Sequence, residues 1–144
     1  MRQLKNKLIL ISLVIFILSL FFDAFKTKDM GKIINFPSFE IFLIGPLAFL
    51  GGGIFEFFVW TANWWLLLSI IFTFKKKYTA AFIFGMIAFC VSASFILWHE
   101  VLAAENGRMA DIYSLETGYF LWLISILFLT FSSIYLKITD KNNA

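Results

Sequence analysis

KKKYTAAFIFGMIAFCVSASFILW, residues 75–98, decides the fold class, because three lysines are followed by a run without a charged residue. A helix needs about 20 apolar residues to cross a hydrocarbon core of about 30 Å, and residues 78–98 meet this requirement. Lipid offers the backbone no hydrogen-bond partner, so such a run satisfies its own N–H and C=O groups as a helix. The stretch therefore predicts a membrane-spanning helix with its basic end at one membrane surface.

Three further apolar runs flank this one, at residues 8–22, 54–74 and 117–136, and Glu56 is the only charge inside any of the four. A composition with 61% hydrophobic and 20% aromatic residues does not suit a soluble domain. We predict an all-α polytopic membrane protein, a four-helix transmembrane bundle in one domain over residues 1–144. The expected spans are residues 8–25, 54–76, 78–98 and 117–136, and the expected outer loops are residues 26–53 and 99–116.

Basic residues predict the orientation of these spans. They gather at the N-terminus, in the turn 75–77 and in the C-terminal tail, where Asp140 is the single acidic residue. The other two connections, counted with Asp23 and Glu56 at their ends, hold more acidic than basic residues. The positive-inside rule places both termini in the cytoplasm of a bacterium, with the protein in its inner membrane. The pI near 9.1 reflects a basic rim that meets lipid headgroups, so no nucleic-acid partner is expected.

The start of the chain and the stretch before the second span need separate interpretation. The first run resembles a signal peptide, but the bulky Phe22 at position −3 of a cleavage site favours an uncleaved anchor. Residues 39–50, interrupted by Pro46 and followed by three glycines, are expected at the outer interface or as a shallow re-entrant piece. The helix after them is expected to break near residues 61–63, with Asn63 as an N-cap. Trp98, Tyr119 and Trp122 are expected in the outer aromatic belt.

Small residues in the third run predict close helix packing. Ala81, Gly85, Ala88 and Ser92 follow one another at i, i+4, i+7 and i+11, and this spacing forms one stripe along a helix. The stripe is expected to pack within the bundle, and the alternative is a homodimer face. Cys90 is the single cysteine, so no disulfide forms within the chain.

Few residues suggest chemistry. Glu56 is an interface or helix-capping residue at the outer end of its span, or alternatively a coupling acid for ion transport. A polar cluster is expected in the second outer loop, formed by His99, Glu100, Glu105, Arg108 and Asp111. Position i+4 from His99 is Ala103, so a helical metal pair is not formed and no metal site is predicted. No catalytic residues and no cofactor are expected, because nucleophile elbows, phosphate loops and paired carboxylates are missing from the sequence.

Three segments resemble a group of small, uncharacterised bacterial membrane proteins. They are Trp60-Thr61-Ala62-Asn63, the apolar run that ends at residues 75–77, and Gly118-Tyr119-Phe120-Leu121-Trp122 at the start of the last span. In that group proline commonly follows the asparagine, whereas this chain has Trp64. The resemblance covers about the last two thirds of the chain, and it implies a bacterial inner-membrane location without an activity.

Two function classes follow from these observations. The first is a non-enzymatic integral membrane protein that acts through helix–helix interaction, as an accessory subunit or as an immunity-type protein against a pore-forming toxin. Its partners are the lipid bilayer and a membrane-protein or toxin partner. The alternative is a small transporter or channel that works as a homo-oligomer, with Glu56 as its coupling residue.

Overall fold

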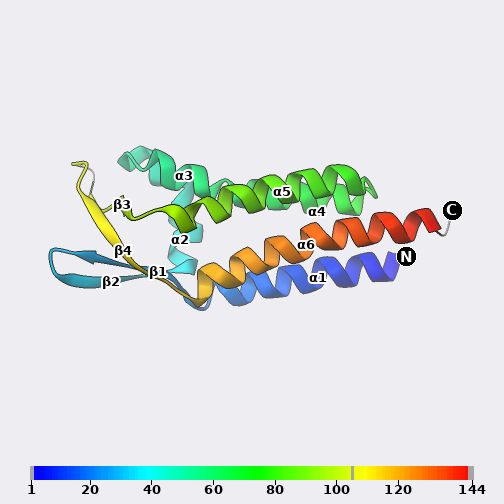
Figure 1. Cartoon of the computed structure of the whole chain (residues 1–144), viewed down its shortest axis with the longest axis horizontal. Helices are drawn as coiled ribbons and strands as arrows, with labels where there is room; N and C mark the ends of the chain where they lie inside the picture. The colour runs from blue at the N-terminus through cyan, green and yellow to red at the C-terminus, as the bar shows by residue number, and fades with distance from the viewer. Residues whose placement is uncertain (1, 105, 143–144) are drawn as a thin grey trace.

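The computed structural model describes residues 2–104 and 106–142. The molecule is elongated, with a bundle of helices that has a small antiparallel sheet at one end, and the first and last described residues lie at the opposite end (Figure 1). The bundle consists of α1 (Arg2–Ser19), α4 (Ala62–Phe74), α5 (Tyr78–Ser94) and α6 (Thr117–Asn142). Helix α6 packs against α1 and α5, and α4 packs against α5.

Within the described part of the chain, three helical segments are long and apolar enough to cross a membrane: Ile54–Phe74, Tyr78–Leu97 and Thr117–Lys141. Helix α1 is not among them. Its uncharged run is shorter than the predicted span 8–25, because the helix ends at Ser19 and the run therefore covers only residues 8–19. At 1.5 Å per residue, this uncharged part is about 18 Å long.

The predicted outer loops contain a sheet of four strands, so the prediction of an all-α fold is wrong in this part of the molecule. The strands are β1 (Asp23–Asp29), β2 (Lys32–Pro37), β3 (Glu100–Leu102) and β4 (Met109–Leu115). Their order is β2-β1-β4-β3, and all neighbours are antiparallel. The central pair, β1 and β4, joins the first outer segment to the second.

A two-residue turn between β1 and β2 explains why this segment forms a hairpin. Met30 and Gly31 both have positive φ, 49° and 81°, as the primed turns of tight hairpins require. Each strand is too short to give a strong periodic signal, and the apolar runs on either side dominate the pattern of the sequence.

The segment between β2 and the second long helix consists of α2 (Ser38–Ile44), the 3-10 helix η1 (Gly45–Gly51) and α3 (Ile54–Trp60). Helix α2 crosses the long axis of the bundle where the helices meet the sheet (Figure 1). Thr61 separates α3 from α4, so a break lies in the region where the sequence predicted one.

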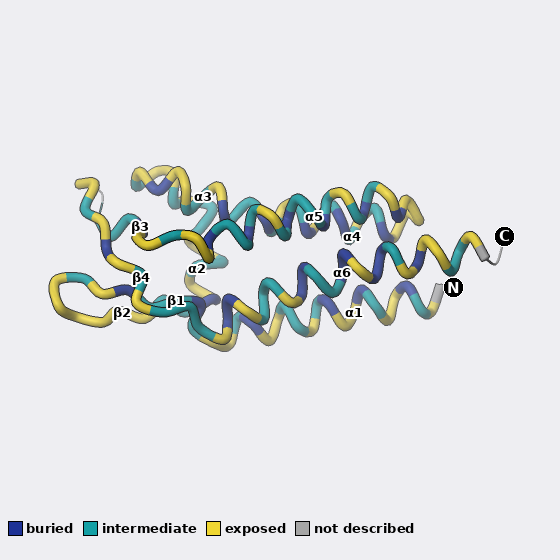
Figure 2. The backbone as a smooth tube through the Cα atoms, in the orientation of Figure 1, coloured by how far each residue is buried: buried dark blue, intermediate teal, exposed yellow. Residues whose placement is uncertain are grey.

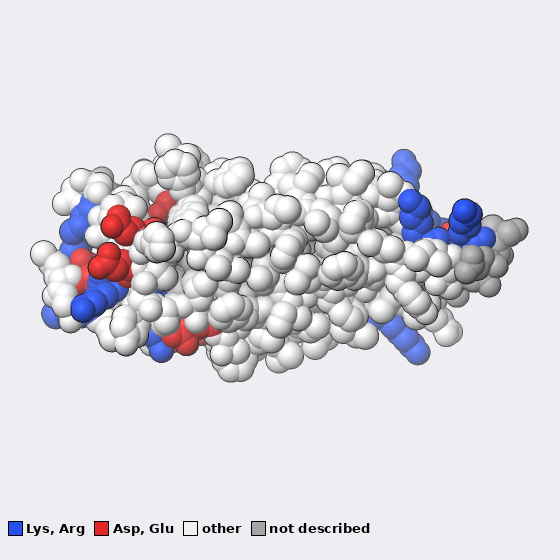
Figure 3. Space-filling view, viewed as in Figure 1, with Lys and Arg blue, Asp and Glu red and all other residues white. Residues whose placement is uncertain are grey.

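Burial and charge follow the long axis of the molecule. Buried residues face the inside of the bundle, whereas the hairpins at the sheet end are largely exposed (Figure 2). On the face that Figure 3 shows, charged side chains gather at the two ends, and the end opposite the sheet is predominantly basic. A wide uncharged surface separates them, as expected for a protein in a bilayer.

Candidate functional site

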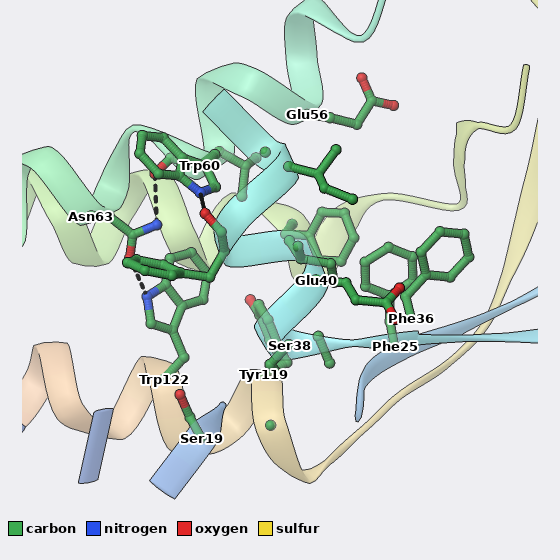
Figure 4. A pocket seen from close by; sticks show the side chains of 18 of the residues that line it. Ser19, Phe25, Phe36, Ser38, Glu40, Glu56, Trp60, Asn63, Tyr119 and Trp122 are labelled. Carbon is green, nitrogen blue, oxygen red and sulfur yellow. Dashed lines mark hydrogen bonds between the residues drawn. The ribbon is translucent and has the colours of Figure 1, made fainter. Parts of the chain in front are cut away.

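A cavity of about 370 Å³ lies where the helices meet the sheet. Its lining is mostly apolar and aromatic, and it draws on α1, α2, η1, α3, α4, α6, the 3-10 helix η2 (Phe95–Leu97), β1, β2 and β3 (Figure 4). Apolar pockets of ~300–1,000 Å³ with a few polar groups are the usual form of small-molecule sites. The cavity is therefore the strongest candidate for a functional site in the described part of the chain.

A series of hydrogen bonds fixes one wall of the cavity. The indole N–H of Trp122 donates to Oδ1 of Asn63 at 3.0 Å, and Nδ2 of Asn63 donates to the carbonyl of Trp60 at 3.0 Å. The indole N–H of Trp60 then donates to the carbonyl of Phe42 at 3.1 Å. These bonds link α6, α4, α3 and α2, and Figure 4 shows the side chains together. The prediction of Asn63 as an N-cap is wrong, because its side chain bridges two tryptophans and no side chain caps α4.

Aromatic rings form the wall nearest the sheet. Phe25 stacks on Phe36 with their centroids 4.7 Å apart, and it also contacts Phe95 at 5.2 Å. Phe95 contacts Tyr119 at 5.7 Å, and the Tyr119 hydroxyl donates to the carbonyl of Ser92 at 2.8 Å. Tyr119 is 2% exposed, so this tyrosine turns inward, whereas the sequence predicted it in the outer aromatic belt.

Two residues of α2 mark the mouth of the cavity. Glu40 and Ile44 both line the cavity and are both exposed, and they lie four residues apart on one face of the helix. Neighbouring exposed side chains of the segment are apolar, including Phe39, Leu43 and Leu47. The mouth thus combines one carboxylate with an apolar surface.

Ser38 is the unusual polar group of the cavity. The residue is 8% exposed, and its hydroxyl has no hydrogen-bond partner among the residues that the structure describes. Gly118 leaves room for it, because a Cβ at position 118 would overlap the Ser38 hydroxyl. A buried hydroxyl without a partner costs about 1–3 kcal/mol.

Glu56 lies on α3 at the edge of the same cavity. Its Oε1 accepts a hydrogen bond from the backbone N–H of Leu102 at 2.8 Å, so it anchors β3 to α3. Its own helix receives no side-chain cap. The coupling role for Glu56 stays a prediction.

The small-residue stripe lies inside the bundle. Ala81, Gly85, Ala88 and Ser92 are all buried on α5. A Cβ at Gly85 would overlap the hydroxyl of Thr130 on α6, which shows how closely these two helices approach. The stripe therefore packs within a single chain in this structure.

The structure does not gather the predicted outer-loop cluster into one site. Arg108 pairs with Asp29 at the first hairpin, with Nη1 2.8 Å from Oδ2, while Glu100 and Asp111 are exposed register partners on β3 and β4. His99 is exposed and Glu105 lies outside the described residues. Among residues 2–104 and 106–142, no group of histidine, cysteine and acidic side chains could hold a metal ion.

A neighbouring ion pair joins the sheet to the last helix. Lys26 on β1 lies 3.2 Å from Glu116, just before α6, and the Ser114 hydroxyl donates to the same carboxylate at 2.6 Å. The hydrogen bonds from Ser114 and from Lys26 lower the pKa of Glu116.

Ser38, Glu40, Trp60 and Trp122 were not predicted as parts of one site. The sequence offered the polar pair of Ser38 and Glu40 within an apolar segment, but it contains no signal that brings this segment beneath Trp60 and Trp122. No family model matches the chain, and no curated protein or solved structure is detectably similar to it.

Proposed function

We propose that this chain is a non-enzymatic inner-membrane protein of four spans, with both termini cytoplasmic, that binds an apolar small molecule at the outer side of the membrane. The observation that carries this proposal is the cavity of about 370 Å³ between the sheet and the bundle. Its apolar walls suit a hydrocarbon, and its position beside the uncharged surface suits a molecule that comes from the bilayer.

The distribution of charge supports the four-span topology. Lysines dominate the end opposite the sheet, as cytoplasmic segments of membrane proteins do (Figure 3). Helix α1 packs along α6, and Lys5 at its start donates to the carbonyl of Phe74 at 2.9 Å. These contacts favour α1 as a fourth, short span beside the other three.

The bonding of the polar side chains supports binding rather than catalysis. Four polar side chains of the lining use their hydrogen-bonding groups in bonds to other residues of the chain: Trp60, Asn63, Tyr119 and Trp122. Among the described residues that line the cavity, no hydroxyl is bonded to a histidine or a carboxylate, so no activated nucleophile is present.

A cavity-filling variant tests the binding function. Ala48 lines the cavity, and Ala48→Phe should displace a bound molecule, whereas Leu47→Phe is a matched control because Leu47 is exposed and lies outside the cavity. Native mass spectrometry of the protein from mild detergent should reveal a bound small molecule in the parent and in Leu47→Phe. Its retention in Ala48→Phe, or the lack of any bound molecule in the parent, would contradict the proposal.

Impermeant maleimide labelling of intact cells tests the topology. In a Cys90→Ser background, Asn35→Cys in the sheet should react, and Lys141→Cys near the C-terminus should react only after the membrane is opened. The reverse pattern would overturn the orientation.

A second candidate is the accessory-subunit or immunity role, and one observation favours it. Strand β2 is an edge of the sheet, and it exposes Ile33 and Ile34. Free strand edges are templates for a strand from another chain. Ile33→Lys with Ile34→Lys should then remove a co-purifying partner protein or a second copy of the chain, while Ala48→Phe should leave it in place. An unchanged composition in the double variant would contradict this role.

A further inference from the structure

One polar group in the lining of the cavity has no hydrogen-bond partner among the described residues. Within the described residues, two buried side-chain atoms have no hydrogen-bond partner, and they are the hydroxyls of Thr27 and Ser38. Ser38 lines the cavity and Thr27 does not. A purely hydrocarbon occupant would leave the Ser38 hydroxyl unpaired, so the hydroxyl indicates an occupant with a polar atom.

The charges of the lining all have one sign. Two carboxylates, Glu40 and Glu56, contribute to the cavity, and lysine, arginine and histidine are absent from its described lining. Glu56 already receives a hydrogen bond from Leu102, whereas the carboxylate of Glu40 at the mouth makes neither a hydrogen bond nor an ion pair with any described residue. A carboxylate at an apolar mouth attracts a cationic head and repels an anionic one.

We propose that the cavity holds the alkyl chain of an amphiphile with a primary ammonium head, whose N–H groups pair with Glu40 and donate a hydrogen bond to the Ser38 hydroxyl. The proposal rests on the binding function proposed above and names the class of its ligand. The position of the mouth beside exposed Ile44 and Leu43 suits a molecule with its head in water and its chain in the apolar phase. Fatty-acid and phosphate heads without an ammonium group are disfavoured by the same charges.

Photoreactive probes test the head group. We would use twelve-carbon chains with a terminal diazirine and an amine, alcohol or carboxylate head, in nanodiscs of phosphatidylcholine. Adducts would be mapped by mass spectrometry on the cavity residues of α2 and η1. The exposed apolar face of α1, which includes Leu10 and Leu18, supplies an internal measure of the probe concentration in the bilayer. After this normalisation, the amine should label the cavity about fivefold more than the carboxylate, the upper range for a partly exposed ion pair.

Two variants and two matched controls assign the contacts. Glu40→Gln should bring the ratio of amine to carboxylate labelling to about one, while Glu100→Gln, an exposed acid outside the cavity, should leave the ratio unchanged. Ser38→Ala should lower amine labelling about threefold to tenfold, the range for one net hydrogen bond. It should also raise the melting temperature of the empty protein, because it removes an unpaired buried hydroxyl. Thr27→Val removes the other unpaired hydroxyl, so it should raise the melting temperature without changing the labelling.

The outcomes separate the two proposals. If no probe labels the cavity above the face of α1, the binding function itself fails. If chains enter but the carboxylate labels as well as the amine, binding stands and the ammonium head is overturned. If the amine probe prevails, unlabelled competitors distinguish two sources of the same chemistry. Loss of amine labelling with phosphatidylethanolamine in the nanodisc would identify a bilayer lipid, and dodecylamine as the only effective competitor would identify a free amine.

Discussion

The helical bundle and the sheet end of the molecule are stabilised by different kinds of contact. In the bundle, small side chains let the helices approach, and buried hydroxyls reach across to neighbouring helices: Ser12 donates to the carbonyl of Ser125 at 2.9 Å, and Ser69 to that of Ala81 at 2.8 Å. At the sheet end, aromatic rings and two ion pairs connect short segments, and the space they leave is the cavity. The bundle therefore depends on close packing, whereas the sheet end tolerates an internal space that a ligand can fill.

The junction between the two halves should be the most sensitive position. A Cβ at Gly118 would lie 2.7 Å from the backbone oxygens of Phe22 and Asp23, and it would also overlap Ser38. Backbone oxygens do not move unless the start of β1 moves, so Gly118→Ala should lower the free energy of unfolding by about 3 kcal/mol. Thermal unfolding followed by tryptophan fluorescence measures this, with the exposed neighbour Thr117→Ala as control. Equal melting temperatures for the two variants would show that the halves are not tightly joined here.

Gly85→Ala tests the packing of the bundle alone. The added methyl group would overlap the Thr130 hydroxyl, and it would lie 3.3 Å from the Ser69 hydroxyl, so the obstacle is formed by side chains. We expect a loss of about 2 kcal/mol, of which Thr130→Ala in the same chain should restore a part. Ile83→Ala, on the exposed face of α5, is the control for a lipid-facing change. Strictly additive effects of Gly85→Ala and Thr130→Ala in a double-mutant cycle would rule out this contact.

The sequence predicted the bundle far better than the sheet end, for physical reasons. Lipid forces every backbone group of a span into its own helix, so residues 54–74 and 78–97 are readable from apolarity alone. The strands β1 and β4 pair with each other although more than eighty residues separate the paired positions in the sequence. No local pattern in either segment predicts this pairing. The candidate site shares this difficulty. Glu56 was identified from the sequence as a charge inside an apolar run. Ser38 could not be identified in this way, because its place in the cavity depends on Gly118, which lies beside it only in the folded chain.

Lys5 connects the start of α1 to the end of α4 at the basic end of the molecule. Its ammonium group donates to the carbonyl of Phe74 at 2.9 Å and lies 5.4 Å from the centre of the Phe74 ring. Lys5→Met keeps the stem and loses these contacts, so we expect a destabilisation of about 1 kcal/mol. Lys7→Met is the matched control, because Lys7 is exposed. Both variants should leave ligand binding at the opposite end unchanged. A change in binding for Lys5→Met would mean that the two ends of the molecule are coupled.

The smallest effect is expected at the sheet end, at Glu116. Its pKa is lowered from the ordinary value of 4.5, first by the hydrogen bond from Ser114 and then by that from Lys26. A carboxyl group with a lowered pKa in the folded state stabilises the fold above the unfolded pKa, and this contribution is lost as the pH falls through the folded value. The melting temperature should therefore exceed that of Glu116→Gln at neutral pH, and the difference should vanish in acid. Ser114→Ala removes the largest cause of the shift, so the difference should be smaller at neutral pH and its loss should be complete at a higher pH. A difference that persists unchanged in acid would mean that Glu116 acts through packing, in the same way as the residues of the bundle.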